Sequence, residues 1–175
     1  MIYTSIIRTP LGAMTASAEE GALTGLWFVG QKYYPSDAGS WVDAPAPQVF
    51  ELLRAWLADY FSGGTRAPLP PIAPKGSSFQ KAVWDILLEI PDSRVTTYGE
   101  IAKRLAVSRG LASMSAQAVG GAVGHNPVSI LIPCHRVVGS DGSLTGYAGG
   151  IDKKKALLQL EQADVTSKES FLKFK

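Results

Sequence analysis

The stretch Ala67-Pro68-Leu69-Pro70-Pro71-Ile72-Ala73-Pro74 holds four prolines in eight residues. Proline fixes φ and has no backbone N–H, so this density argues against a helix or a central strand and predicts a stiff, extended linker. We therefore place a domain boundary here. It separates an N-terminal α/β domain, residues 1–74, from a second domain, residues 75–163, and a tail, residues 164–175. The predicted fold class is α+β.

The first domain is predicted to be an antiparallel sheet covered by one helix. Apolar residues alternate or cluster in three strand-length runs, 2–8, 11–18 and 22–29, which are separated by turn residues. A Pro/Gly/Ser-rich loop, 30–46, follows the third run. An apolar stripe then recurs at helical spacing until Gly63-Gly64, which can end a helix; its members are Val49, Leu52, Leu53, Trp56, Leu57, Tyr60 and Phe61.

The second domain is predicted to be mainly helical. Ser77 and Gln80 have the spacing of a capping box, and the helix that they begin should stop at Pro91. After an extended segment, 95–98, come two short helices, 99–106 and 115–123. Two short helices joined by a turn are compatible with a winged helix-turn-helix-like DNA-binding motif, although many such pairs bind nothing.

The second of these short helices has almost no side-chain bulk, and its small residues are Ala116, Ala118, Gly120, Gly121 and Ala122. Each paired glycine costs about 1 kcal/mol in a helix interior, so the composition needs a reason. The helix either packs tightly against another backbone or approaches a narrow groove of DNA, and both explanations can hold on opposite faces.

The composition narrows the class of protein. A hydrophobic content of 46% with 18% charged residues is typical of a folded chain. Cys134 is the only cysteine, so no internal disulfide can form and no cysteine-based zinc site is available, which favours a reducing, intracellular setting. No leader and no stretch of membrane-spanning length is present, so we expect no membrane association and a cytoplasmic protein, or a nuclear one in a nucleated cell.

The charge is distributed unevenly between the two halves. Residues 1–74 carry four Lys/Arg against six Asp/Glu, whereas residues 75–175 carry thirteen against nine. The second half is therefore the one expected to meet a polyanion, although this modest excess is a weak indication.

Cys134 stands beside His135, one of only two histidines, and follows Val128-Ser129-Ile130-Leu131-Ile132-Pro133. The apolar run predicts an interior strand, and an unpaired cysteine at its end can be a small buried hydrophobe. It can also be a nucleophile, because a neighbouring imidazole stabilises a thiolate. These residues by themselves leave both interpretations open.

Three segments decide between them: Asn126–Val137 with its Pro-Cys-His-Arg-Val pentapeptide, Gly146-Tyr147-Ala148-Gly149-Gly150, and Leu157–Glu161. Together they closely resemble the O6-alkylguanine-DNA alkyltransferases, and the resemblance runs over residues 77–162. Residues 1–74 match the variable, RNase H-like N-terminal domain of the single-function members. The resemblance implies irreversible, one-turnover transfer of an alkyl group from O6 of guanine, or O4 of thymine, to a cysteine. It implies no cofactor, and since the zinc ligands of some relatives have no cysteine counterparts here, we predict no metal.

The resemblance assigns a role to each residue of the site. Cys134 is the acceptor, His135 takes its proton through a water molecule, and Glu161 fixes the imidazole tautomer. The Tyr98 hydroxyl is aimed at N3 of the base, and Asn126 forms the hinge before the active-site segment. The substrate pocket is assigned to the carbonyls of Cys134 and Val137, the backbone of Ala148, the loop residues Tyr147 and Gly149, and Ser129.

Some of these residues also have ordinary structural explanations. Glu161 can be a solvated helix residue and Tyr98 can belong to the core. The run Lys153-Lys154-Lys155 is most simply a solvated helix start, although Lys154 matches a family position near the active-site loop.

The implied partner is double-stranded DNA containing O6-alkylguanine, which a monomer approaches from the minor groove. The target atom is buried in a duplex, so the nucleotide has to be rotated out of the stack. Family members usually fill the gap with an arginine, and this sequence has Gln117 instead. The other residues assigned to DNA are Ser115, Ala118, Gly121 and Arg136.

Two other classes of protein remain as alternatives. Non-enzymatic proteins that bind alkylated DNA lack the cysteine, so Cys134 argues against that class. Helix-turn-helix regulators of the sensor type add a cysteine-rich domain, which a chain with one cysteine cannot form.

Overall fold

The computed structural model describes residues 1–44, 47–64 and 67–174, and the chain divides into two compact units. The first unit comprises Met1–Lys75 together with Pro127–Leu131, and the second comprises Gly76–Asn126 and Ile132–Lys175. The division is not between two contiguous halves, because a five-residue segment from the second half of the sequence belongs to the first unit.

The first unit is built on a four-stranded sheet with the order β3-β2-β1-β4. The strands β1 (Tyr3–Thr9), β2 (Gly12–Glu19) and β3 (Ala22–Phe28) form the predicted antiparallel meander. A short strand β4 (Val42–Asp43) pairs in parallel with β1, so the sheet is mixed rather than purely antiparallel. The sequence did not predict β4, because two exposed residues inside a Pro/Gly/Ser-rich loop give no strand periodicity.

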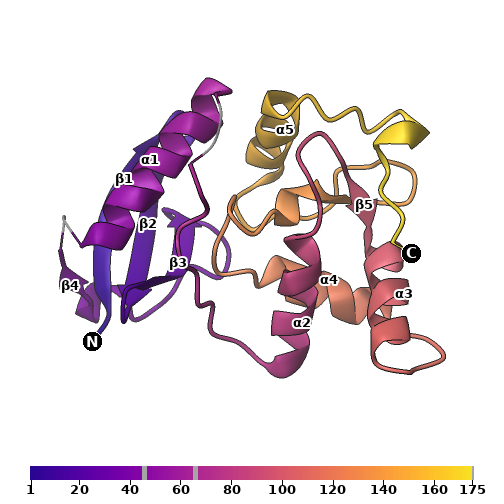
Figure 1. Ribbon diagram of the computed structural model, residues 1–175, viewed down its shortest axis with the longest axis horizontal. Coiled ribbons are helices and arrows are strands. Elements are labelled where there is room, and N and C mark those ends of the chain that lie inside the picture. Colours follow the sequence, from indigo (N-terminus) through magenta and orange to yellow (C-terminus); the bar gives the residue numbers. More distant parts are fainter. Residues whose placement is uncertain (45–46, 65–66, 175) are drawn as a thin grey trace. The chain divides into compact units, whose positions relative to one another are not determined.

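The helix α1 (Gln48–Ser62) lies along one face of this sheet (Figure 1). Its buried stripe consists of Val49, Phe50, Leu53, Trp56, Leu57 and Tyr60. Gly63 ends the helix with a φ of 75°, a left-handed conformation that favours glycine. The helix and its end confirm the prediction, but the predicted stripe was wrong at Leu52, which is exposed, and at Phe61, which is only half-buried, and it missed the buried Phe50.

Two separate segments cover the outer edge of β3. Leu23 donates to the carbonyl of Pro71 at 2.8 Å and accepts from the N–H of Ala73 at 2.7 Å, so the proline-dense stretch follows the strand. Further along, Leu26 exchanges hydrogen bonds with Pro127 and Ser129 in the same way. An uncovered strand edge would invite pairing with another chain, and these two segments prevent it.

The second unit contains four α-helices: α2 (Ser78–Leu87), α3 (Tyr98–Ser108), α4 (Ala116–Gly124) and α5 (Ile151–Leu160). The capping box of Ser77 and Gln80 is present, and α3 and α4 confirm the predicted helix pair. The helix α4 packs against both α2 and α3 (Figure 1). The indole N–H of Trp84 donates to the carbonyl of Ala122 at 2.9 Å, which joins α2 to α4 in the core.

Short strands and the last residues complete this unit. The strands β5 (Thr96–Thr97) and β6 (Val137–Val138) pair in parallel, and the C-terminal segment runs beside β5 (Figure 1). Val95 accepts a hydrogen bond from the N–H of Leu172 at 2.7 Å and donates one to Ser170 at 2.9 Å. The segment predicted as a tail therefore packs into the second unit.

The prediction of a strand at Val128–Ile132 is wrong. Only Val128 makes a bridge, and the chain then turns, because the N–H of Leu131 donates to the carbonyl of Ser129 at 2.8 Å across Ile130, whose φ is 71°. A positive φ is unusual for a β-branched residue and marks local strain. The apolar residues of this run are buried in turns, which the apolar pattern cannot distinguish from a buried strand.

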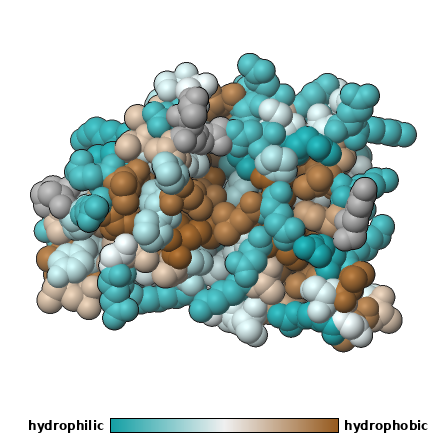
Figure 2. Space-filling model, viewed as in Figure 1, coloured by the Kyte–Doolittle hydropathy of each residue, from teal (hydrophilic) through white to brown (hydrophobic). Residues whose placement is uncertain are grey.

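The surface is a mixture of hydrophilic and hydrophobic residues (Figure 2). Large apolar side chains that are exposed include Ile6, Val29, Tyr33, Val107 and Leu111. Scattered exposure of this kind is normal for a folded protein. No helix in the described ranges is both long and apolar enough to cross a membrane.

Candidate active site

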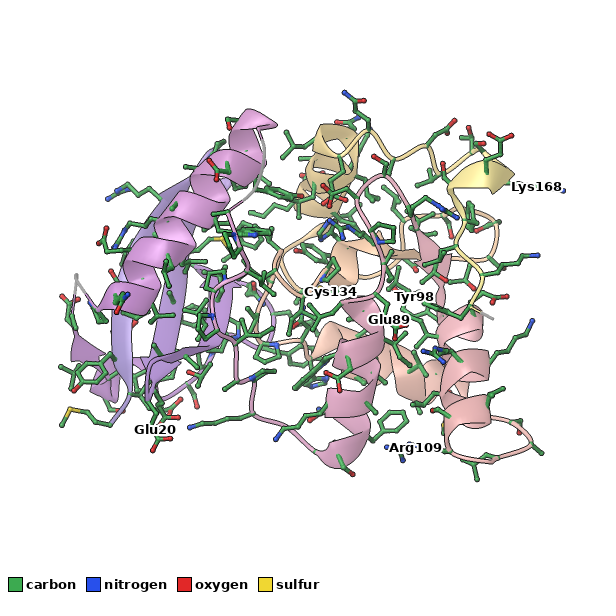
Figure 3. The ribbon with its side chains drawn as sticks, viewed as in Figure 1. Glu20, Glu89, Tyr98, Arg109, Cys134 and Lys168 are labelled. Atoms are coloured by element: carbon green, nitrogen blue, oxygen red, sulfur yellow. The ribbon has the colours of Figure 1, made fainter. Side chains whose placement is uncertain are left out.

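Cys134 lies in the interior of the second unit, at the start of a short 3₁₀-helix, Cys134–Arg136 (Figure 3). Its N–H donates to the carbonyl of Ile132 at 2.8 Å, and Pro133 between them has φ −82° and ψ 66°. These values describe an inverse γ-turn, which proline favours because its ring fixes φ near this value. The turn and the 3₁₀-helix place three consecutive polar or charged side chains, Cys134, His135 and Arg136, inside the protein.

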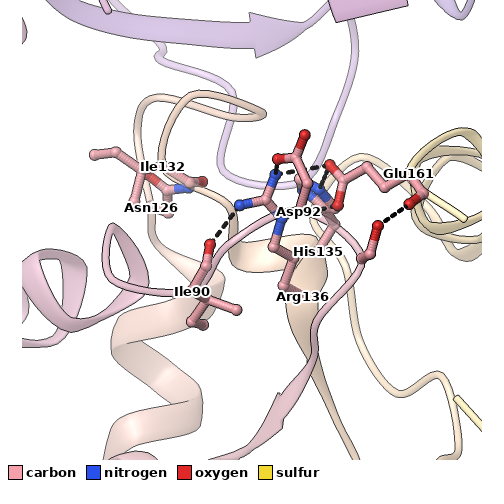
Figure 4. A network of polar contacts seen from close by, with 8 residues as sticks. Ile90, Asp92, Asn126, Ile132, His135, Arg136 and Glu161 are labelled. Atoms are coloured by element: carbon pink, nitrogen blue, oxygen red, sulfur yellow. Dashed lines mark hydrogen bonds and ion pairs between the residues drawn. The ribbon is translucent and has the colours of Figure 1, made fainter. Parts of the chain in front are cut away.

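His135 and Glu161 form a buried pair. The distance between Nε2 and Oε2 is 2.7 Å, and neither side chain is more than 1% exposed (Figure 4). Burial lowers the pKa of His135 below its ordinary value, and the neighbouring carboxylate of Glu161 opposes that shift. The imidazole is therefore favoured in its neutral form, with Nε2–H donating to Glu161 and Nδ1 left as an acceptor.

The Nδ1 atom of His135 is buried and has no hydrogen-bond partner within the described residues. Buried polar atoms are nearly always hydrogen-bonded, to protein or to ordered water, so Nδ1 is an acceptor that the described residues leave available. Glu161 follows directly after α5 and is the residue that caps its C-terminus. Its burial rules out the interpretation of Glu161 as a solvated helix residue.

Arg136 holds the other side of Glu161. Its Nε donates to Oε1 of Glu161 at 2.8 Å, and its Nη2 donates to Oε2 at 3.0 Å. The same guanidinium also donates through Nη1 to the carbonyl of Ile90 and through Nη2 to the carboxylate of Asp92 (Figure 4). The pKa of Glu161 is held well below its ordinary value by His135 and Arg136, although burial opposes the shift. The prediction that Arg136 contacts DNA is corrected by this geometry, since the guanidinium is buried and its donors face protein acceptors.

Asn126 lies between α4 and the loop that leads to Cys134. It is buried, and its Nδ2 donates to the carbonyl of Ile132 at 2.7 Å (Figure 4). Burial raises the pKa of Cys134 above its ordinary value, and a hydrogen bond with the Asn126 side chain acts in the opposite direction, as does the positive charge of Lys154. Asn126 therefore both fixes the turn and contacts the thiol.

Tyr98 begins α3 and is half-buried near Cys134 (Figure 3). Its hydroxyl donates to the carbonyl of Thr145 at 3.3 Å, and burial raises its pKa above the ordinary value. The phenol therefore stays protonated at neutral pH and can act as a donor. Tyr147, Ala148 and Gly149 are half-buried in the loop that follows Thr145 and leads to α5.

Lys154 is a residue of this site that the residue patterns did not single out. It is fully buried in α5, and its Nζ donates to the carbonyl of Val137 at 2.6 Å, that of Thr145 at 2.8 Å and that of Gly146 at 3.3 Å. The interpretation of the lysine run as a solvated helix start is therefore wrong for Lys154 and right for the exposed Lys155.

One solvent-exposed face of the helix α4 has little side-chain bulk. Ser115 caps it by accepting a hydrogen bond from the N–H of Ala118 at 3.1 Å, and Gln117, Ala118 and Gly121 are exposed. A Cβ placed on Gly121 would meet nothing within 4 Å, so packing inside the protein does not require a glycine there. Internal packing therefore does not account for Gly121, and the approach of DNA to this face stays a prediction.

Comparison with known proteins identifies the family. Residues 78–163 match the family described as 6-O-methylguanine DNA methyltransferase, DNA binding domain. The methylated-DNA–protein-cysteine methyltransferase of Mycobacterium tuberculosis is 40% identical over 163 residues, which cover 93% of this chain and 94% of that protein. The chain belongs to the methylated-DNA–protein-cysteine methyltransferase family.

Solved structures of this methyltransferase family have the same fold. The crystal structure of the M. tuberculosis O6-methylguanine methyltransferase superposes with a TM-score of 0.80 at 40% identity, covering 93% of each chain. A crystal structure of M. tuberculosis OGT in complex with DNA gives a TM-score of 0.78 at 37% identity, covering 92% of each chain. The α+β class predicted from the sequence is confirmed.

The methyltransferase site gathers most of the residues predicted for it. Cys134, His135, Glu161, Asn126 and Tyr98 all belong to the second unit, as does the pocket loop that follows Gly146. Ser129 belongs to the first unit. The roles assigned to all of these residues stay predictions. Within the described ranges no group of three or more His, Cys, Asp or Glu side chains could hold a metal ion.

Proposed function

We propose that this protein repairs DNA directly, by transferring the methyl group of O6-methylguanine irreversibly to Cys134. The observation that carries the proposal is the buried His135–Glu161 pair directly beside the only cysteine of the chain. The same reaction extends to O4 of thymine. Since transfer consumes the thiol, one protein molecule repairs one base.

Activation of Cys134 is the first requirement, because the thiolate and not the thiol is the nucleophile. Burial disfavours the thiolate, so the site has to take the proton away and stabilise the charge. We assign the proton to Nδ1 of His135, transferred through a water molecule, with Glu161 holding the imidazole tautomer and stabilising the imidazolium. The buried acceptor Nδ1 and the 2.7 Å contact at Nε2 support this relay.

In the transfer step the Sγ–carbon bond forms as the carbon–O6 bond breaks, and the electron pair stays on guanine. Stabilising that developing negative charge lowers the barrier. Tyr98 is assigned to donate a hydrogen bond to N3 of the departing base, and its raised pKa keeps it a donor. The backbone of Ala148 and the carbonyls of Cys134 and Val137 are assigned to O6 and to the exocyclic amine.

DNA binding is assigned to the α3–α4 pair. A duplex hides O6 inside the base stack, so the nucleotide has to rotate out before it reaches the buried Cys134. The bare face of α4 suits close approach to the minor groove, and Gln117 is the exposed side chain that can occupy the space left by the nucleotide. The solved complex of a 37%-identical relative with DNA supports this partner.

The experiment is an intact mass measurement after incubation with duplex DNA that contains one O6-methylguanine. We expect a gain of one methyl group, located on the peptide that contains Cys134, and the same amount of repaired guanine as of protein. Cys134→Ser is the control that should bind the DNA without gaining mass, because serine is far harder to ionise.

Two results would overturn the proposal. Binding without any mass gain in the native protein would indicate a protein that only recognises damage. More than one repaired base per protein molecule would exclude a reaction that consumes its acceptor.

A further inference from the structure

The C-terminal segment, residues 164–174, lies beyond residues 78–163, which match the family domain. It is nevertheless packed into the second unit, where it runs beside β5 (Figure 1). The ends of a chain are usually poorly ordered unless contacts tie them down. The contacts of this segment therefore indicate what it does for the rest of the unit.

The first attachment of the segment is to the chain just before Tyr98. The N–H of Val95 donates to the carbonyl of Ser170 at 2.9 Å, and the N–H of Leu172 donates to the carbonyl of Val95 at 2.7 Å. The hydroxyl of Thr96 adds a third hydrogen bond, to the carbonyl of Leu172 at 3.0 Å. Since Tyr98 directly follows β5, these bonds fix the place from which its side chain starts.

The second attachment is to the turn 139–143, which leads toward the pocket loop. A Cβ placed on Gly142 would lie 2.5 Å from the carbonyl oxygen of Val165 and 3.9 Å from Cζ of Phe171. The turn and the main chain of the C-terminal segment are therefore so close that a side chain at position 142 would collide. Leu144 packs together with Val165 and Phe171 against the same cluster of buried residues. The members of this cluster are Val95, Val138 and Leu158.

The two attached stretches of chain meet at the pocket. Leu144 is followed directly by Thr145, whose carbonyl accepts the hydroxyl of Tyr98 at 3.3 Å. That distance is long for a hydrogen bond from a hydroxyl group, and Thr145 is exposed, so this bond alone holds the two walls weakly. Phe171 contacts both sides, since it forms a bridge with Val95 and packs beside the turn.

We propose that the C-terminal segment positions the walls of the substrate pocket, with Phe171 as the residue that holds the chain before Tyr98 and the chain before Thr145 together. The inference rests on the proposed function, since this pocket is the one assigned to the alkylated base. A pocket that is already held in its binding arrangement loses less conformational freedom when the base enters. The segment therefore acts on binding of the base and not on activation of the thiol.

Three substitutions separate this role from a general contribution to stability. Phe171→Ala removes the ring and leaves the main-chain bonds of Ser170 and Leu172. Phe171→Leu keeps an apolar side chain at the same place. Phe174→Ala is the matched control, because Phe174 is the other aromatic residue of the segment and its ring centroid lies 6.0 Å from the guanidinium carbon of Arg104, in α3.

The first readout is amide hydrogen exchange, measured by mass spectrometry on peptides that cover residues 95–98 and 139–149. We expect Phe171→Ala to speed exchange in both peptides and to leave exchange in β1 and β2 at the native rate, because only the local attachment is lost. Phe171→Leu and Phe174→Ala should exchange as the native protein does. Faster exchange throughout the chain of Phe171→Ala would show general destabilisation and would contradict the inference.

The second readout is the single-turnover reaction with free O6-alkylguanine base at several base concentrations, below the unfolding temperature of each variant. We expect the half-saturating concentration of Phe171→Ala to rise about tenfold, as for a pocket that is in its binding arrangement about a tenth of the time. The maximal rate and its pH profile should stay native, and Phe171→Leu should restore binding. A purely structural role would instead lower the fraction of protein that reacts and leave the half-saturating concentration unchanged.

Native exchange in the 139–149 peptide of a folded Phe171→Ala protein, or a native half-saturating concentration, would overturn the inference. If Phe171→Ala does not fold, Phe171→Val decides by the same measurements, since it removes less of the side chain. Exchange does not require methyl transfer. A native protein that transfers no methyl group would therefore refute the proposed function, while the exchange comparison would still decide whether Phe171 holds the two stretches of chain.

Discussion

Arg136 and Glu161 form a two-point contact inside the protein, with Nε to Oε1 at 2.8 Å and Nη2 to Oε2 at 3.0 Å. The contact keeps a buried carboxylate ionised, and the Arg136 charge lowers the pKa of His135 while that of Glu161 raises it. Since Glu161 also accepts a hydrogen bond from His135, Arg136 acts on the imidazole of His135 through the carboxylate.

Arg136→Met should destabilise the protein by about 3–5 kcal/mol, because it leaves the carboxylate of Glu161 buried without its cation. Denaturant unfolding measures the loss. Arg104→Met is the control, since Arg104 pairs with Glu89 near the surface at 3.1 Å, and removing that pair should cost no more than about 1 kcal/mol. Equal losses in the two variants would contradict the assigned role of Arg136.

Glu161→Gln should slow methyl transfer by roughly 100-fold, within the range that acid–base assistance contributes, since an amide cannot stabilise the imidazolium of His135. Single-turnover rates on free O6-alkylguanine measure the effect apart from DNA binding, and circular dichroism checks that the variant is folded. A folded Glu161→Gln protein with the native rate would show that the relay is assigned wrongly.

Gln117→Arg should tighten binding to duplex DNA and make it more dependent on salt, because an added phosphate contact releases counterions. Gln117→Gly should weaken binding. Neither substitution should alter the rate of alkyl transfer from free O6-alkylguanine base. Gln159→Arg adds the same charge to an exposed position of α5 and serves as the control. An equal loss of rate on duplex and on free base would place Gln117 in the pocket or the fold rather than in the DNA interface.

Gly121→Ala should raise the free energy of unfolding by up to about 1 kcal/mol, since alanine is the better helix former and a Cβ meets nothing there. Gly121→Leu should also fold, yet it should bind duplex DNA about tenfold more weakly because the side chain keeps α4 out of the groove. Gln159→Leu is the control for an added apolar side chain. If Gly121→Leu bound duplex DNA as tightly as the native protein does, α4 would not belong to the DNA interface.

Stability should fall as the pH drops below about 6.5. The pKa of His135 is lowered in the folded protein, so the unfolded chain takes up that proton first as the pH falls through the ordinary value of 6.5. The pKa of Glu161 is also lowered, so its contribution is present above its ordinary value of 4.5 and is lost as the pH falls toward its folded pKa. Denaturant unfolding over a pH series measures both contributions to the free energy of unfolding. Glu161→Gln should remove the contribution of the Glu161 carboxylate. A free energy of unfolding that stays constant down to about pH 4 would contradict the assignment for His135, and one that does not fall further below that pH would contradict the assignment for Glu161.

Local sequence was sufficient for the elements that depend on neighbouring residues. The helix α1 follows from its apolar stripe and from Gly63, and α2 begins at a capping box that needs only Ser77 and Gln80. Three short segments, with the pentapeptide around Cys134 the most specific of them, were sufficient for the resemblance to the family. These features are decided within a few residues, so a sequence shows them directly.

The partners of the buried charged groups were decided by tertiary structure. Nothing local indicates that Arg136 faces Glu161 rather than DNA, because the two are 25 residues apart and meet only when α5 packs beside the 3₁₀-helix. The spacing of Lys154, Leu157, Leu158 and Glu161 does place all four on one helical face, and that periodicity was the available signal for both buried charges. Charged residues on an apolar stripe are usually solvated, so only the packed structure could show that these two are not.

The apolar run before Cys134 also shows what the local sequence can indicate and what depends on tertiary structure. Its apolar composition correctly indicated burial, but burial does not distinguish a strand from a turn. The positive φ of Ile130 and the inverse γ-turn at Pro133 are local conformations that the surrounding structure imposes. The sequence by itself determined which family the chain resembles and, through that resemblance, which residue is predicted to be the nucleophile. The tertiary structure decided how Cys134 is presented and which charges surround it, because desolvation and ion pairing depend on residues that only folding brings together.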